Sequence, residues 1–189
     1  MKNVLVVSKS DKATQGLIAM LKQEGCTAFT TATTAEEAKR CVSNNQFDLI
    51  FIYTPLADEV GLNLSAYLAN STSAGVFIFV SNETALKAGA KLMDCGVTAI
   101  IKPVNADVLH QCLLAWGAFA KRLETLTQEN KSLKNKLEEI KLIDRAKCVL
   151  MQCLAMSESQ AHRYLEKQAM DLQISKRRVA EQVLNTYDF

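Results

Sequence analysis

Short runs of consecutive apolar residues alternate with amphipathic stretches along the first hundred residues of the chain. The runs VLVV (4–7), LIFIY (49–53), VFIFV (76–80) and AII (99–101) lack the polar–apolar alternation of a half-exposed strand. Continuous apolar runs of this length are typical of parallel strands covered on both faces. A more polar run, TAFTT (27–31), is the predicted edge strand.

Stretches with helical spacing of apolar residues separate these strands. They span residues 11–23, 34–43, 62–69 and 83–95, and a fifth begins near Asn105. Thr34 and Glu37 form a capping-box pattern, in which hydroxyl and carboxylate bond the free amides of a helix start. Five strands alternating with five helices predict an α/β domain with a doubly wound, five-stranded parallel sheet of the flavodoxin-like kind.

The fifth helix continues past the point at which such a domain should end. From residue 116 onward, apolar residues follow alternating steps of three and four, as in a coiled-coil heptad. The eight positions are Trp116, Phe119, Leu123, Leu126, Asn130, Leu133, Leu137 and Ile140. The pattern favours a parallel homodimer through this seam, with Asn130 setting its register, over a single exposed helix that packs on its own domain.

The remaining residues predict an all-α part. The pattern stays helical to Leu154, and Ser157 with Gln160 forms a second capping box before a helix that ends near Asp171. Ser175 is the predicted N-cap of a last helix. These helices form a predicted C-terminal three-helix bundle. The expected domains are thus residues 1–112, a coiled-coil helix at 113–140, and the bundle at 141–189.

Composition and charge exclude several classes of protein. No apolar run approaches the length of about 18 residues that a membrane span requires, so we expect a cytoplasmic protein with no membrane partner. The six cysteines form no C-x-x-C pair and only two histidines are present, which predicts reduced thiols, no metal site and no cofactor. The net charge of +2 does not by itself indicate a nucleic-acid partner, although 13 of the 22 basic residues follow residue 120.

Ser81 at the end of the fourth strand and Lys102-Pro103 at the end of the fifth resemble the receiver domain of bacterial response regulators, over residues 1–112. The resemblance implies a cis Lys102–Pro103 peptide bond. Receivers also carry two acidic residues after the first strand and a phosphoryl-accepting Asp after the third. Here Ser8 and Lys9 occupy the acidic-pair positions, and Tyr53 occupies the acceptor position.

Phosphorylation requires the carboxylates that these positions lack. Mg²⁺ needs hard anionic oxygens, and the acceptor carboxylate is the nucleophile. A phenol with a pKa of about 10 replaces neither, and Asp58 and Glu59 lie beyond Pro55 in the outgoing loop. We therefore expect a degenerate receiver that is not switched by phosphate. In it, the Lys102 ammonium either extends to solvent or finds another acceptor, such as the Tyr53 oxygen or the Ser81 hydroxyl.

The three last helices closely resemble the ANTAR domain, the RNA-binding module of bacterial transcription antitermination regulators. The matching positions are Ala146, Lys147, Leu150, Met151, Ser157, Ala161, Leu165, Ala169, Met170, Arg178, Val179 and Ala180. Two positions depart from the family pattern. Cys148 replaces a small residue that is often Gly, and Ala155 replaces a common Gly, which costs the turn before Ser157 some conformational freedom.

The resemblance implies a regulator that binds RNA hairpins in leader transcripts and so prevents a terminator from forming. Cations that contact phosphate and flat rings that stack on bases suit such a partner. We rank Lys147, Arg177 and Arg178 above Arg163 and Tyr164, and Tyr164 also fits a core position. A regulatory protein or small molecule at the receiver-like domain, or dimer assembly, would replace phosphate as the signal.

Two other classes of function remain open. The segment 175–184 could serve as the recognition helix of a DNA-binding regulator, and a protein-interaction adaptor would bind no nucleic acid. An enzyme is not expected, because no nucleophile with its base, metal cluster or phosphate loop stands out in the sequence.

Overall fold

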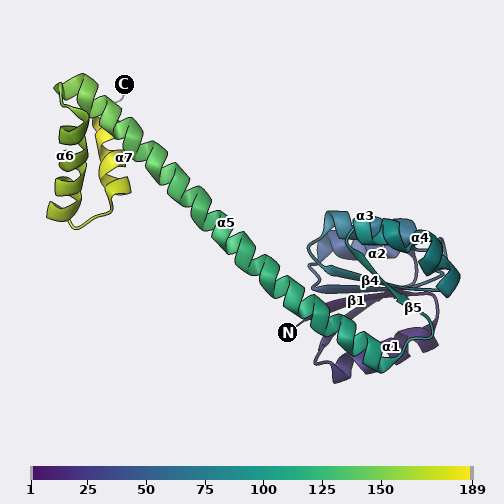
Figure 1. Ribbon diagram of the computed structural model, residues 1–189. Helices are drawn as coiled ribbons and strands as arrows, with labels where there is room; N and C mark the ends of the chain where they lie inside the picture. The colour runs from purple at the N-terminus through teal and green to yellow at the C-terminus, as the bar shows by residue number, and fades with distance from the viewer. Residues whose placement is uncertain (1, 188–189) are drawn as a thin grey trace. The chain divides into compact units, whose positions relative to one another are not determined.

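The chain divides into two compact units, and the computed structural model describes residues 2–187. We call them the N-terminal unit, which extends to residue 118, and the C-terminal unit, which begins at residue 119. The long helix α5 (Ala106–Leu154) supplies residues to both units. Figure 1 shows the elements in chain order. Among the residues described, no helix is long and apolar enough to cross a membrane.

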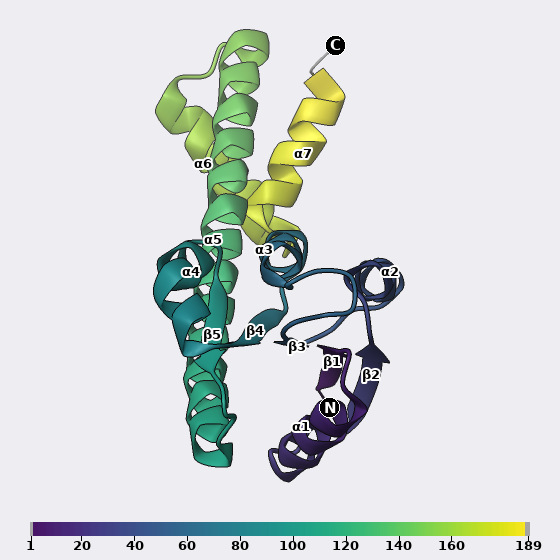
Figure 2. The ribbon, with the colours of Figure 1, turned by 90° about the vertical axis from the view of Figure 1, so that its right-hand side faces the viewer.

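Five parallel strands form the sheet of the N-terminal unit. They are β1 (Asn3–Ser8), β2 (Ala28–Ala32), β3 (Leu49–Tyr53), β4 (Gly75–Val80) and β5 (Val97–Ile101). Their order is β2-β1-β3-β4-β5, and each neighbouring pair is parallel. Figure 2 shows them side by side, from β5 on the left to β2 on the right. The predicted doubly wound parallel sheet is confirmed, with the more polar strand at an edge.

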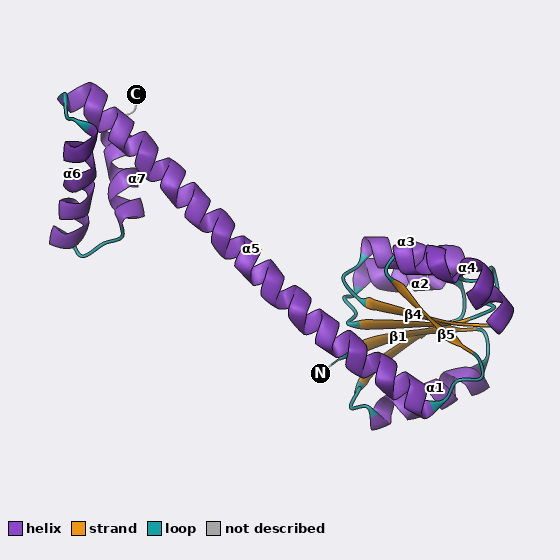
Figure 3. Cartoon of the chain, in the orientation of Figure 1, coloured by secondary structure: helices purple, strands orange, loops and turns teal. Residues whose placement is uncertain are grey.

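Helices cover both faces of the sheet (Figure 3). One face is covered by α1 (Asp11–Gln23) and the first turns of α5, and the other by α2 (Ala35–Asn44), α3 (Leu62–Ser71) and α4 (Asn82–Asp94). Each face has its own cluster of buried apolar side chains. Because both faces of β3 and β4 are buried, these strands are continuous apolar runs without polar alternation.

Trp116 packs on the sheet rather than lying on an exposed stripe. Its ring meets Phe77 edge-on, with centroids 6.2 Å apart and planes at 82°. It also lies so close to Gly75 that a Cβ atom on that glycine would be 2.5 Å from Cε2 of the indole. Trp116 is thus half-buried in the core of the N-terminal unit, and we remove it from the predicted dimer seam.

The C-terminal unit contains a bundle in which α6 (Glu158–Asp171) and α7 (Lys176–Tyr187) pack with the last turns of α5. Its core is formed by Ala146, Val149, Leu150, Ala161, Leu165, Val179, Ala180 and Val183. The predicted capping box is confirmed, because Ser157 and Gln160 bond each other's backbone amides. Ser175 caps α7, since its Oγ accepts a hydrogen bond from the Arg178 amide at 3.3 Å.

The turn between α5 and α6 contains a residue with left-handed backbone geometry. Ala155 has a φ of +50°. A side chain with a Cβ atom costs about 1–2 kcal/mol in this region, whereas glycine adopts it freely. Ala155 therefore adopts a backbone conformation that is less favourable for alanine than for the glycine common at this position in the ANTAR pattern.

Candidate functional site

The sheet brings the predicted receiver positions to one edge, where the carboxyl ends of the strands meet. Ser8 and Tyr53 are paired in register as the last residues of β1 and β3. Ser8 is buried and bonds within its own turn, donating to the Ser10 carbonyl at 3.3 Å and accepting from the Ser10 amide at 3.1 Å. Lys9 is exposed. The acidic-pair positions thus hold a buried hydroxyl and a solvated cation.

Lys102 meets Tyr53 at this edge, but through the face of the ring. Its Nζ lies 4.9 Å from the ring centroid and donates a hydrogen bond to the Thr54 carbonyl at 2.8 Å. The prediction that Lys102 donates to the Tyr53 oxygen or the Ser81 hydroxyl is therefore wrong. The carbonyl of the residue after β3 lies within reach of the ammonium, and the electron-rich ring face adds a cation–π contact. Partial burial lowers the pKa of Lys102.

Ser81 has a structural role that the receiver resemblance did not indicate. It is the N-cap of α4, and its Oγ accepts a hydrogen bond from the Thr84 amide at 3.2 Å. The predicted cis Lys102–Pro103 bond is confirmed, and a second cis bond, Thr54–Pro55, was not predicted. Next to it, the buried Thr54 hydroxyl donates to the Phe79 carbonyl at 2.7 Å and ties the end of β3 to β4.

The two acids in the loop after β3 are both engaged with helix termini. The Asp58 carboxylate accepts hydrogen bonds from the Ala35 amide at 2.9 Å and the Glu36 amide at 3.3 Å, at the start of α2. These backbone bonds lower the pKa of Asp58. Glu59 accepts from the Leu64 amide in α3 at 3.0 Å. Both carboxylates are committed to the fold, which supports the view that neither substitutes for the missing acceptor.

A small apolar hollow of about 190 Å³ lies beside Tyr53, between α1 and the residues that follow β5. Its lining includes Gly16, Met20, Tyr53, Pro103 and Val104. The surroundings of Tyr53 are thus suited to apolar contact on one side and to the Lys102 ammonium on another. Within residues 2–187, no three His, Cys, Asp or Glu side chains group so that they could hold a metal ion.

The C-terminal unit presents three of the predicted basic residues to solvent. Arg163, Arg177 and Arg178 are exposed. Arg177 Nε lies 3.1 Å from Glu181 on the same helix. Because this ion pair is exposed, an RNA phosphate could replace Glu181 as the partner of Arg177 at little cost in free energy. Tyr164 is half-buried against the bundle core, so its ring serves packing as well as any contact with a base.

Lys147 differs from these arginines because it bridges two acids. Its side chain is only 16% exposed, with Nζ 2.8 Å from Asp144 and 3.3 Å from Glu158. These hydrogen bonds, with that to Asp144 the largest cause, raise the pKa of Lys147. Because Asp144 is on α5 and Glu158 begins α6, Lys147 holds the turn that contains Ala155. The ANTAR resemblance identified Lys147 as a candidate RNA contact, but it did not indicate that Asp144 and Glu158 contact its ammonium group.

Six apolar side chains of the predicted seam are exposed along α5 in the C-terminal unit. They are Phe119, Leu123, Leu126, Leu133, Leu137 and Ile140, and each is between 53% and 72% exposed. We call them the α5 stripe, and Asn130 lies at its middle. A row of exposed large apolar side chains on one helix is typical of a protein–protein interface.

Two known domain families match the chain. A sequence model of the response regulator receiver domain matches residues 4–114, and one of the ANTAR domain matches residues 131–184. The ANTAR match begins inside the segment predicted as a coiled coil. The transcriptional regulatory protein PdtaR of Mycobacterium tuberculosis is 27% identical over 188 residues, which cover 98% of this chain and 90% of that protein.

Solved structures resemble part of the chain. A two-component response regulator from Clostridium difficile has a TM-score of 0.52 and 24% identity, covering 61% of this chain and 94% of its own. A response regulator receiver domain protein from Clostridium thermocellum has a TM-score of 0.56 and 19% identity, covering 67% and 99%. At these identities, the likeness establishes the fold alone.

Proposed function

The chain belongs to the response regulator receiver family and ends in an ANTAR domain, and from this premise we propose that it is a transcription antitermination regulator that binds hairpin RNA. The observation that carries the proposal is the set of exposed arginines on the ANTAR bundle, formed by Arg163, Arg177 and Arg178. Exposed guanidinium groups bind RNA phosphates and stack on unpaired bases. Bound hairpins of the leader transcript would then exclude the competing terminator hairpin.

The order of importance among the basic residues follows from their partners. Arg178 and Arg177 come first, because they are exposed on the first turn of α7. Lys147 comes after them, since it would have to leave Asp144 and Glu158 before it could contact RNA. Its main role in this proposal is to hold the α5–α6 turn in position.

The active form in this proposal is a parallel homodimer joined along the α5 stripe. Burial of exposed Leu and Phe side chains favours association, and Asn130 side chains that face each other select the parallel, in-register pair. A dimer carries two ANTAR domains, so the second hairpin binds in an intramolecular step with a higher effective concentration.

The receiver in this proposal is not switched by phosphate. Ser8, Lys9 and Tyr53 provide no carboxylate for Mg²⁺ or for phosphoryl transfer, and Asp58 and Glu59 cap helices instead. The signal would come from a regulatory protein or a small molecule that binds the N-terminal unit. The apolar hollow beside Tyr53 offers one surface for such a partner.

The test is a titration of the full chain with a fluorescent RNA hairpin taken from RNA that copurifies with the protein. Arg178→Ala should weaken binding about tenfold and reduce the slope of log affinity against log salt by about one. Arg40→Ala, an exposed arginine on α2 of the N-terminal unit, is the matched control and should leave affinity unchanged.

Competition distinguishes the alternative functions. Unlabelled hairpin RNA should displace the probe, and duplex DNA of equal length should not. Displacement by duplex DNA at the same concentration would favour a DNA-binding regulator. Failure to bind either nucleic acid would favour a protein-interaction adaptor. Unchanged hairpin affinity in Arg178→Ala would contradict the site assignment.

A further inference from the structure

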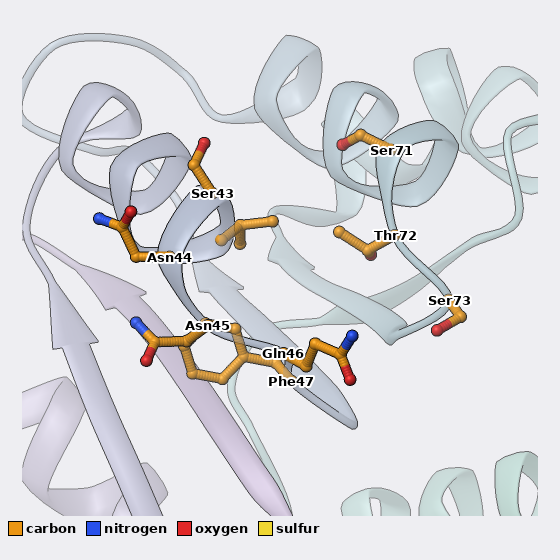
Figure 4. Close-up of a pocket in the computed structure, with 9 residues that line it drawn as sticks. Ser43, Asn44, Asn45, Gln46, Phe47, Ser71, Thr72 and Ser73 are labelled. Carbon is orange, nitrogen blue, oxygen red and sulfur yellow. The ribbon is translucent and has the colours of Figure 1, made fainter.

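A polar pocket lies at the amino-terminal edge of the sheet, remote from the carboxyl edge that holds Tyr53. It has a volume of about 530 Å³, within the usual range for small-molecule sites. Residues 42–47 line one side and residues 71–73 the other. Figure 4 shows Ser43 and Asn44 on one side of the space and Ser71, Thr72 and Ser73 across from them.

Two helices end at this pocket. The last residue of α2 is Asn44 and the last residue of α3 is Ser71, and both line it. The final turn of a helix has carbonyl groups without intrahelical partners, and its end carries a partial negative charge of about half an electron. Both helix ends therefore favour a cation, and both disfavour an anion.

Three of the four hydroxyl groups that line the pocket present acceptors, because their protons are already used. Ser43 donates to the Lys39 carbonyl at 3.0 Å, Ser71 to the Tyr67 carbonyl at 2.7 Å, and Thr72 to the Leu68 carbonyl at 2.8 Å. A hydroxyl has one proton and two lone pairs, so each oxygen keeps acceptor capacity. The Asn45 amide likewise donates to the Cys41 carbonyl at 3.2 Å, which leaves its oxygen available.

Among the residues that the structure describes, no charged side chain lines the pocket, and this narrows the class of ligand further. Divalent cations need carboxylate ligands, which the lining lacks. A neutral polyol could bond the donors and acceptors of the lining, but it gains nothing from the partial negative charge at the two helix ends. A primary ammonium group carries a positive charge and three donors but no acceptor, so it complements this lining.

We infer that the pocket between the ends of α2 and α3 binds a small primary amine. The ammonium group lies among the hydroxyl, amide and carbonyl oxygens, and the ring of half-buried Phe47 provides an apolar wall for the carbon chain. The site does not depend on RNA binding, on the α5 stripe or on the receiver edge.

The test is a calorimetric titration of the full chain with 1,4-diaminobutane dihydrochloride at constant ionic strength. Saturable binding is expected, and 1,4-butanediol, the neutral compound with the same carbon chain, should give none. Asn44→Lys places an ammonium at the pocket on a helix end where a cation is favourable, so the variant should fold. It should weaken diamine binding at least about tenfold through charge repulsion and occupancy of the acceptors.

Asn63→Lys is the matched control. Asn63 is exposed near the other end of α3 and does not line the pocket, so this variant should bind the diamine as the unmodified protein does. The inference is overturned if the diamine shows no saturable binding, if 1,4-butanediol binds equally well, or if Asn44→Lys and Asn63→Lys have the same affinity.

Discussion

Replacement of Ala155 by glycine should stabilise the C-terminal unit. Ala155 has a φ of +50° at the turn between α5 and α6, and its Cβ atom makes this conformation unfavourable. The turn lies between two fixed elements, the last turns of α5 and the capping box at Ser157. The backbone therefore keeps its left-handed geometry, and this conformation lowers the stability of the unit when residue 155 is alanine.

The expected magnitude is the difference between two effects. Glycine removes a left-handed penalty of about 1–2 kcal/mol. It also makes the unfolded chain more flexible, which costs about 0.4–1 kcal/mol. The net gain is about 1 kcal/mol, which corresponds to a rise in melting temperature of about 4–8 °C for a unit of this size.

The assay is thermal unfolding followed by circular dichroism at fixed protein concentration, because dimerisation would make the melting temperature depend on concentration. Trp116, the only tryptophan, is half-buried in the N-terminal unit, so its fluorescence follows that unit separately. Ala169→Gly, within α6, is the control and should lower stability by about 1 kcal/mol. Equal or lower stability of Ala155→Gly would refute the backbone argument.

Three further predictions concern the dimer, the receiver edge and the α2 cap. Light scattering should report a dimer, and Asn130→Leu should stabilise this dimer or change its oligomeric state. Asn135→Leu, the same substitution at a position outside the seam, should have no effect. A monomer at micromolar concentration would exclude the seam as a dimer interface. Acetyl phosphate with Mg²⁺ should add no phosphoryl group, and a mass increase mapped to the N-terminal unit would contradict this expectation. Since the pKa of Asp58 is lowered in the folded state, its contribution to stability is fully present above the unfolded pKa of about 3.9 and is lost as pH falls through the lower folded value. Asp58→Asn should therefore lower the urea midpoint at pH 7, and this loss should shrink as the pH falls below the unfolded pKa. An equal loss at every pH would show that the carboxylate charge is not responsible.

Local patterns in the sequence determined the elements and much of their arrangement. The helix predicted at residues 11–23 and the strand predicted at 49–53 have the observed bounds, and the capping box at Ser157 is present as expected. These features depend on periodicity and on hydrogen bonds between residues a few positions apart, which a sequence displays directly. Lys102-Pro103 similarly indicated both the receiver fold and the cis bond.

Only the tertiary structure decided which polar and aromatic groups meet. Lys102 contacts the Thr54 carbonyl, Asp58 caps a helix that begins 23 residues earlier in the chain, and Trp116 packs against Gly75. Each contact joins groups from segments that the fold brings together, so no local periodicity reports it. The heptad pattern placed Trp116 on the seam because spacing identifies the face of a helix, whereas the neighbouring sheet decides whether that face is already covered.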